Sequence, residues 1–502
     1  MLPDPMTVLP HVPGRSWPTG NKFLNGPFAP WTAESEAYDL EVVGQIPEDL
    51  AGALFRVTAN PRFQPRNLDR YHWWEGDGMV GAVYLRDGRA AFRSRWVETG
   101  SMRVEVEAGE AIYSGFVNGG TPGRLPAGAP AAKNVANTNV GVFDDHLIVY
   151  YEGGLPHHLH PSTLETLGTY DFHGGVDVLC TAHFKIDPDS GDMLFFAATG
   201  PVVTWYRADA KTGHVIESTV VDIGVPVLMH DFAVSATYAI FFVTPAQFRL
   251  DLIAKGRPGV VWDERATPDG VRIALLNRRT NQVTWHEVGG QFANTHFFNA
   301  YETDGELIID GHRITRLGTP ADRLDTPLGS HEWFPPALPH RWRVDLRTGR
   351  TREEQVSGIA GEFPRINEAY LGRRNRYGYF VTTRDLAADT MTDGLARHDN
   401  LLDATTVVDG PAGLTSPSEP VFVPRDGARA EDDGYLLTIW WNRETGLSEL
   451  LIHDAADLRR DPLARVKLPA RIPFGFHGNW ADRAALDSAV AARDRKPGHA
   501  SR

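Results

Sequence analysis

The sequence predicts an all-β protein of the propeller type, on three observations. Short segments rich in β-branched and aromatic residues recur along almost the whole chain. Turn-forming stretches separate them, and 49 glycines and 35 prolines are many for a helical protein. Helical periodicity is weak, and many hairpins at irregular spacing over roughly 450 residues fit a propeller better than a sandwich.

The predicted strands are short, apolar and bounded by turn formers. In chain order they are residues 52–59, 78–85, 146–151, 192–200, 238–245, 305–310, 377–383 and 434–441. Several are followed or preceded by a turn that an Asp or Asn opens and a Gly or Asn closes with positive φ, which is typical of a β-hairpin. These turns are residues 187–191, 209–213, 277–281, 345–349 and 442–446. Short helices are expected within 245–256 and 482–495.

No low-complexity linker divides the chain, so a single domain over residues 1–502 is expected. Within it, residues 1–35 are expected to form an extended arm and 485–502 a flexible tail. The repeats are too degenerate for the blades to be counted from the sequence.

Composition excludes several classes of function. The formal charge is −14 and no basic face is evident, which argues against a nucleic-acid partner. The single cysteine, Cys180, excludes an intrachain disulfide and a zinc site built on paired cysteines; a buried core position is expected for it. Residues 1–23 lack the pattern of a signal peptide, and no apolar run approaches the ~18 residues of a membrane span. A cytoplasmic location is expected, with peripheral membrane contact through residues 248–262 as an alternative to a loop that covers the propeller.

Four of the 19 histidines lie beside aromatic or small residues near the start or end of a strand. They are His183 in CTAHFKIDP, His230 in LMHDFAVS, His296 in NTHFFNAYE and His477 in FGFHGNW. Inner strands of a propeller converge on one axis, so distant residues can meet there, and neutral imidazole binds iron, zinc or copper. For any one of these histidines taken alone, an ordinary surface or hydrogen-bonded role is the alternative. Asp231, next to His230, is interpreted as a strand-end cap rather than a ligand.

Three glutamates stand in apolar or turn surroundings, where an unpaired charge is costly. They are Glu152 in YYEGGLP, Glu362 in GEFPRIN and Glu419 in SEPVFVPR. Each alone is compatible with an ordinary salt bridge or a turn cap. Since ligating imidazoles need their other N–H oriented, usually by a carboxylate, these three are candidates to orient the histidines.

The blocks FRVTANPRF, HWWEGDGMVGAVYL, MHDFAVS, SEPVFVPR and GFHGNW stand in the order found in the carotenoid cleavage oxygenase family, which the chain resembles over nearly its whole length. The resemblance implies a seven-bladed β-propeller with a dome of loops and short helices over the metal. It further implies that His183, His230, His296 and His477 hold one non-haem Fe(II) per chain, and that Glu152, Glu362 and Glu419 hydrogen-bond to histidines. The implied reaction is O₂-dependent cleavage of a C=C double bond of a carotenoid or apocarotenoid into two carbonyl products, retinal being a product of this type.

The resemblance leaves the substrate open between two classes. Family members that cleave stilbenes or phenylpropanoids, of the lignostilbene and isoeugenol type, carry a lysine before the first of these glutamates and a tyrosine in an upstream loop. Here Tyr151 precedes Glu152 and Phe116 takes the loop position, so a carotenoid or apocarotenoid is preferred and a phenolic alkene is the alternative. Thr138 aligns with a threonine beside the open coordination position, its alternative being a hydrogen-bonded strand residue. The other candidates for the substrate and O₂ pocket are Phe116, Tyr151, Trp205, Phe297 and Phe474.

A third hypothesis is a propeller that binds a ligand without catalysis, because a fold does not fix a function. The chain has no G-x-S-x-G elbow, Walker loop or G-x-G-x-x-G fingerprint, so hydrolase and nucleotide-dependent chemistry are not indicated. The expected partners are a small lipophilic alkene and O₂. The sequence does not specify the bond that is cleaved, the isomer preference, the number of oxygen atoms that enter the products or the oligomeric state.

Overall fold

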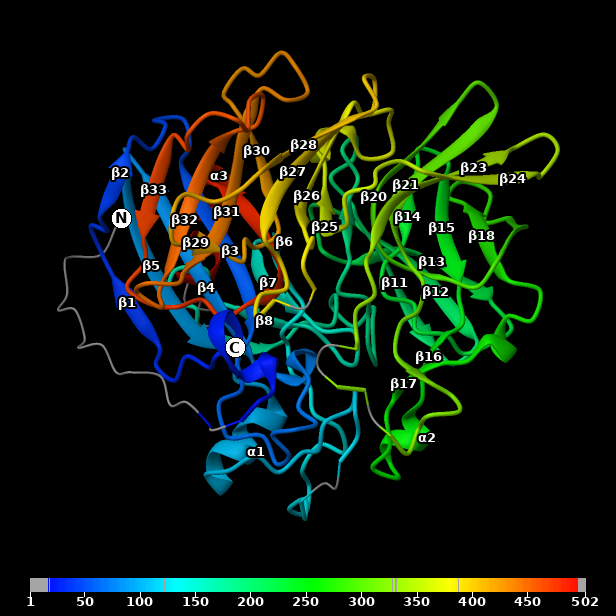
Figure 1. Ribbon diagram of the computed structural model, residues 1–502, viewed down its shortest axis with the longest axis horizontal. Helices are drawn as coiled ribbons and strands as arrows, with labels where there is room; N and C mark the ends of the chain where they lie inside the picture. The colour runs from blue at the N-terminus through cyan, green and yellow to red at the C-terminus, as the bar shows by residue number, and fades with distance from the viewer. Residues whose placement is uncertain are drawn as a thin grey trace, which may run out of the picture.

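The computed structural model describes residues 17, 19–120, 123–326, 328–329, 332–386 and 388–494. Its strands form seven antiparallel sheets, the blades of a β-propeller, and one small three-stranded sheet (Figure 1). The all-β propeller predicted from the sequence is therefore confirmed. The ring is closed by the two ends of the chain, because the last strand, β34, pairs with β3 in the first blade, and β2 pairs with β33 in the last.

The first three blades follow the chain from residue 35 to 222, except that β2 joins the last blade and the closing strand β34 joins the first. Blade 1 contains β1 (Ser35–Ala37), β3 (Gly52–Ala59), β4 (Gly78–Arg86), β5 (Arg89–Trp96) and β34 (Gly475–Asp482). Blade 2 contains β6 (Asn139–Phe143), β7 (His146–Tyr150), β8 (His157–Leu159) and β9 (Thr166–Thr169). Blade 3 contains β10 (Lys185–Ile186), β11 (Met193–Thr199), β12 (Val202–Ala208) and β13 (Val215–Asp222).

The remaining four blades continue in chain order. Blade 4 contains β14 (Ala233–Val234), β15 (Tyr238–Val243), β18 (Val271–Asn277) and β19 (Val283–Gly289). Blade 5 contains β20 (Ala293–Thr303), β21 (Glu306–Ile314), β23 (Leu338–Asp345) and β24 (Thr351–Gln355). Blade 6 contains β25 (Gly361–Arg365), β26 (Tyr377–Thr382), β27 (Gly394–Asp399) and β28 (Ala404–Val408). Blade 7 contains β2 (Val42–Gly44), β29 (Leu414–Thr415), β30 (Val421–Pro424), β31 (Gly434–Asn442), β32 (Ser448–Asp454) and β33 (Ala464–Lys467).

A dome lies at one end of the propeller, at the lower edge of Figure 1. Its regular elements are α1 (Gly100–Ala108), α2 (Leu250–Ile253) and the small sheet of β16 (Ala246–Phe248), β17 (Val260–Trp262) and β22 (Thr319–Pro320). Short 3₁₀ helices form at Lys22–Leu24, Gly26–Phe28, Trp73–Glu75, Glu264–Ala266 and Glu368–Tyr370. No helix in the described part of the chain is long and apolar enough to cross a membrane.

All eight strand segments predicted from the sequence coincide with observed strands, and the predicted turns join strands within blades. The turn chemistry is as expected: the carboxylate of Asp209 accepts from the amides of Lys211 and Thr212. The closing residue has positive φ, 70° at Gly446 and 59° at Asn281.

The hydrophobic core is divided among the spaces between neighbouring blades, since each blade can bury its apolar faces only against the next. One cluster joins blades 3 and 4 through β11, β12, β15 and β18, and another joins blades 4 and 5. Cys180 lies in the cluster between blades 2 and 3 with 1% of its surface exposed, which confirms the core position expected for it.

The two ends of the chain differ in part from the expectation. Residues 485–494 of the expected tail belong to α3 (Arg483–Asp494), the predicted Ala-rich helix, which contacts β3 and β34 and buries Ala489 completely. Within the expected arm, Phe23 and Phe28 are buried against Trp73 and Phe474. Residues 1–16, 18 and 495–502 of these two segments lie outside the described residues. Residues 245–256 form β16 and the single-turn α2 instead of one helix.

Because of one buried histidine on β32, we expect the folded protein to lose stability in acid. His453 is 4% exposed, and burial lowers its pKa from 6.5 to about 4, so the folded protein keeps the ring neutral while the unfolded chain protonates it. Stability is therefore lost as the pH falls from about 6.5 towards 4, and at pH 5 this histidine costs about 2 kcal/mol. We expect His453→Leu to flatten the decline of the unfolding free energy between pH 7 and 5, measured by urea denaturation. An unchanged slope would contradict this account.

Candidate metal centre

Four histidines from four different blades meet near the propeller axis. Nε2 of His230 lies 3.0 Å from Nε2 of His183 and 3.1 Å from Nε2 of His296. One nitrogen from each of His183, His230, His296 and His477 lies within 4.8 Å of the others. The ring centroids of His183 and His477 are 4.4 Å apart. The first three histidines are separated by 47 and 66 residues in the sequence. The circular arrangement of the blades brings them together.

Each histidine is placed by the inner strand of its blade. His183 and His230 lie two and three residues before the first residues of the short strands β10 and β14, whereas His296 and His477 lie within β20 and β34. The backbone is held as well: the amide of His183 donates to the Thr181 hydroxyl at 3.0 Å, and the amide of His477 donates to the Thr138 carbonyl at 3.1 Å.

The donor set fits a metal ion. Metal–imidazole bonds of about 2.0–2.1 Å place neighbouring ligands at right angles about 3 Å apart, which matches the Nε2 separations of 3.0 and 3.1 Å. Nε2 of His477 is buried and has no hydrogen-bond partner in the described part of the chain. Burial lowers the pKa of His477 to about 4 and that of His183 well below its usual value, so both rings are neutral at pH 7 and offer lone pairs. The cluster is therefore a candidate metal site, with four donors that could hold one ion.

The three predicted glutamates each face a histidine from the side away from the cluster. Nδ1 of His296 donates to Glu362 at 2.6 Å, Nδ1 of His477 donates to Glu419 at 2.8 Å, and Nδ1 of His230 donates to Glu152. With the proton on Nδ1, the Nε2 lone pair of each ring points to the common centre.

The local charges keep two of these carboxylates, those of Glu419 and Glu362, ionised. Burial alone would raise the pKa of Glu419, but His477 and the guanidinium of Arg365 outweigh it and hold the pKa at about 2. The pKa of Glu362 is also strongly lowered, because His296 outweighs the effect of burial. Negative charge is thus fixed around a site in which His183 and His477 offer neutral donors.

Three of the pocket candidates lie near the four histidines. Phe116 and Tyr151 lie together beside Glu152, and Thr138 contacts the backbone of His477. The ring of Phe116 is 6.3 Å from that of Tyr151 and 6.0 Å from that of Phe248, and Tyr151 directly precedes Glu152. Thr138 is 6% exposed, its hydroxyl donates to Asn137, and its carbonyl holds the backbone of His477.

Two pocket candidates are corrected by the structure. Trp205 on β12 is 1% exposed and packs against Phe232 in the core between blades 3 and 4. Phe297 follows His296 on β20, so its side chain points to the other face of the strand and packs on Phe242 in the core of blades 4 and 5. Both are therefore core residues.

One aromatic residue next to the cluster was missed. Phe363 stacks on His296 with ring centroids 5.6 Å apart and lies 5.4 Å from His477; the candidate Phe474 is one ring further out, 6.2 Å from Phe363. The available signal was its position directly after Glu362. Phe363 has φ of 56°, a conformation uncommon for a bulky residue, which turns its ring towards the histidines.

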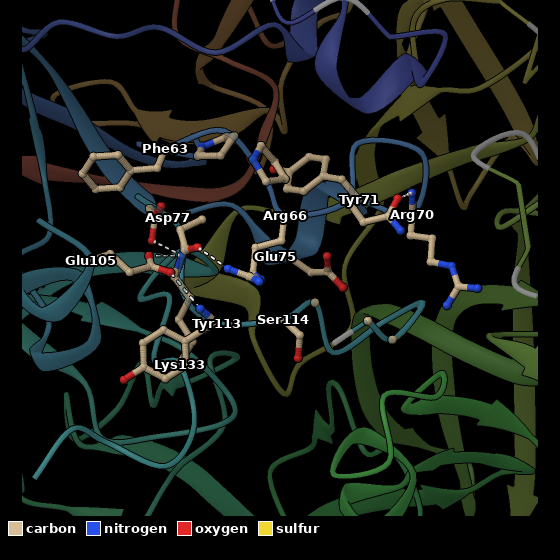
Figure 2. Close-up of a pocket in the computed structure, with 17 residues that line it drawn as sticks. Phe63, Arg66, Arg70, Tyr71, Glu75, Asp77, Glu105, Tyr113, Ser114 and Lys133 are labelled. Carbon is tan, nitrogen blue, oxygen red and sulfur yellow. Dashed lines mark hydrogen bonds and ion pairs between the residues drawn. The ribbon is translucent and has the colours of Figure 1, made fainter. Parts of the chain in front are cut away.

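A separate cavity of about 280 Å³ lies in the dome, and its lining includes none of the four histidines or three glutamates (Figure 2). Lys133 lies on its wall with Nζ 2.8 Å from carboxylate oxygens of both Asp77 and Glu105. Glu75, whose pKa burial raises to about 7, accepts from the amide of Val117 at 2.7 Å. The cavity wall thereby fixes the loop that carries Phe116.

Comparison with known proteins gives one consistent group. The family model described as RPE65, retinal pigment epithelial membrane protein, matches residues 28–482. Isoeugenol monooxygenase of Pseudomonas nitroreducens is 31% identical, covering 92% of this chain and 98% of the relative. Carotenoid 9,10(9′,10′)-cleavage dioxygenase 1 of Phaseolus vulgaris is 32% identical, covering 91% and 88%. The crystal structure of Pseudomonas brassicacearum lignostilbene dioxygenase superposes with a TM-score of 0.82 at 25% identity, covering 92% of this chain and 99% of that one.

Proposed function

Because the chain belongs to the RPE65 family of carotenoid oxygenases, we propose that it is an Fe(II)-dependent oxygenase that cleaves a C=C double bond of a carotenoid or apocarotenoid. The alkene R–CH=CH–R′ and O₂ become two carbonyl compounds, RCHO and R′CHO, with no further reductant. The observation that carries the proposal is the cluster of four imidazoles, three of them hydrogen-bonded to carboxylates.

In this proposal His183, His230, His296 and His477 hold one ferrous ion, and Glu152, Glu362 and Glu419 orient three of them. Iron bound there supplies the activation of O₂ for reaction with the alkene. The chain's own residues keep the Nδ1 protons in place, exclude water and orient the substrate. In a site without an acid–base pair, this positioning and the exclusion of water are what accelerate the reaction.

The preference for an apolar polyene is supported by the side chains next to Glu152. Tyr151 occupies the position before this glutamate, and the adjacent rings are Phe116 and Phe248. Such a wall offers apolar contact and no cation to stabilise a phenolate.

One observation favours the alternative, cleavage of a stilbene or phenylpropanoid alkene. The hydroxyl of Tyr151 makes no hydrogen bond among the described residues, and burial raises its pKa well above the usual value, so it stays protonated as a donor. A phenolic hydroxyl of a substrate could accept this hydrogen bond.

The proposal is tested by supplying the ferrous protein with a β-apocarotenal and, separately, with a hydroxystilbene and isoeugenol, while O₂ uptake and products are measured. Cleavage of the apocarotenal supports the proposal, and cleavage of the phenolic alkenes alone supports the alternative. A protein that retains no iron after ferrous reconstitution would favour the non-catalytic propeller. Labelled O₂ counts the oxygen atoms that enter the products.

Two substitutions of Tyr151 should move the substrate preference in opposite directions. Tyr151→Phe removes the donor, so we expect the ratio of apocarotenal to phenolic turnover to rise about tenfold, the value of one hydrogen bond. Tyr151→Lys introduces a cation that can stabilise a phenolate, so the same ratio should fall. Turnover of both substrates measured on each variant checks this, and identical ratios in all three proteins would show that residue 151 does not face the substrate.

A further inference from the structure

The carboxylate of Asp231 joins three neighbouring blades. Asp231 lies two residues before the first residue of β14 of blade 4, and its side chain is 2% exposed. Oδ1 lies 3.0 Å from Nζ of Lys185 on β10 of blade 3. Oδ2 accepts from the amide of Phe297 on β20 of blade 5 at 3.0 Å. Oδ1 also accepts from the amide of Phe232 at 2.8 Å, as the strand-end cap expected from the sequence does.

Each of these three attachments is next to a histidine of the cluster. Lys185 is two residues after His183, Asp231 follows His230, and Phe297 follows His296. One buried carboxylate therefore fixes the relative position of the backbone segments that carry three of the four imidazoles.

His183 is also the exception among the four histidines. The other three each have Nδ1 hydrogen-bonded to a glutamate. Among the described residues, the carboxylate oxygen within 4 Å of Nδ1 of His183 is Oδ1 of Asp231, at 3.9 Å, which is too long for a direct hydrogen bond. Negative charge nevertheless faces this ring, as it faces the other three.

We propose that Asp231, paired with Lys185, is a positioning residue of the metal site: it sets the spacing of His183, His230 and His296 and supplies the negative charge that faces His183. The inference rests on the proposed function, since it concerns the same metal. Asp231 does not bind the ion and acts through the strands that it joins.

Asp231→Asn separates this role from simple packing. The amide has nearly the same shape, but its single oxygen cannot replace two carboxylate oxygens, and its NH₂ group would face either Lys185 or a backbone N–H. We expect the affinity for Fe²⁺ and for Co²⁺, used as a spectroscopic probe, to fall about tenfold, as for other groups that orient ligands. The visible absorption of the Co²⁺ protein should shift, because the ligand spacing changes.

Lys185→Met provides a second variant on the rim of the site, where Lys185 is 18% exposed. It keeps both backbone hydrogen bonds of Asp231 and removes the ion pair, together with the contact of the Lys185 ammonium with the Phe232 ring at 5.8 Å. We expect the same spectral shift with a smaller loss of affinity. Lys185→Arg restores the cation and should restore most of the wild-type spectrum.

The matched control is Asp192→Asn in blade 3, the blade that carries Lys185. Asp192 is likewise buried, pairs with Arg207 at 2.6 Å and accepts from the amide of Ala210. Neither Arg207 nor Ala210 is adjacent in sequence to a histidine of the cluster. Asp192→Asn should lower thermal stability without changing metal affinity or the Co²⁺ spectrum.

Three outcomes would overturn the inference. A folded Asp231→Asn variant with wild-type affinity and spectrum would show that Asp231 acts only as a cap. An equal effect of Asp192→Asn would assign the change to general stability. If the wild-type protein itself binds no Fe²⁺ or Co²⁺, the proposed function fails together with the inference, whereas a metal-binding wild type with a silent Asp231→Asn variant overturns the inference alone.

Discussion

His296→Ala is expected to remove both iron and alkene cleavage. The substitution deletes one of four converging donors and leaves the half-buried Glu362 with its charge but without the ring that donates to it at 2.6 Å. A bound metal supplies several kcal/mol of charge stabilisation, so turnover should fall by at least about a hundredfold. Iron content after ferrous reconstitution and O₂ uptake with the preferred alkene measure the two losses.

His286→Ala is the matched control for this prediction. His286 lies on β19, in the outer part of blade 4, where Nδ1 contacts the Gly349 carbonyl at 3.2 Å. Its removal should leave iron content and turnover at the wild-type level. Full iron and full rate in His296→Ala would show that the cluster is not the catalytic centre.

The strands were predictable because each of the eight segments carries an apolar or aromatic run bounded by turn formers, a signal that depends only on local sequence. The inner strands β10 and β14 are two residues long in the structure and carry no such run. His183 and His230, which lie shortly before these strands, are recognisable from the surrounding motifs. Each imidazole lies near the axis because the blades close into a circle.

The pocket residues were harder to predict, because a strand alternates its side chains between two faces and the sequence does not say which face meets the axis. Phe297 shows this directly: once His296 points to the cluster, its neighbour must point into the core. Asp231 shows the other limit. Its capping contact to Phe232 is local, whereas its contacts to Lys185 and Phe297 exist only after three blades have assembled.

Glu419 is expected to produce the second largest effect, because one buried carboxylate serves both the metal site and the core. It accepts from Nδ1 of His477 at 2.8 Å and from the amide of Gly478 at 3.0 Å, and it faces the guanidinium of Arg365 at 3.4 Å. Glu419→Ala removes the acceptor of the Gly478 amide and one of the two carboxylates that face Arg365, which keeps its ion pair with Glu368 at 3.3 Å. We expect this to cost about 1–3 kcal/mol of stability, the value of a buried donor that loses its acceptor. The substitution also frees His477 to rotate, so metal affinity should fall about 10–100-fold. Denaturant unfolding and Fe²⁺ titration measure the two effects.

Glu419→Gln separates the two roles, since it keeps an acceptor for His477 but removes the negative charge. We expect an intermediate loss of metal affinity and an altered acid response. The folded protein holds the pKa of Glu419 at about 2, below the usual 4.5, so its stabilising charge is present above pH 4.5 and is lost as the pH falls towards 2. The control is Glu449→Gln on β32, where a buried carboxylate pairs with Arg465 at 2.8 Å. If Glu449→Gln reduced metal affinity as much as Glu419→Gln, the effect would reflect a weakened propeller rather than the orientation of His477.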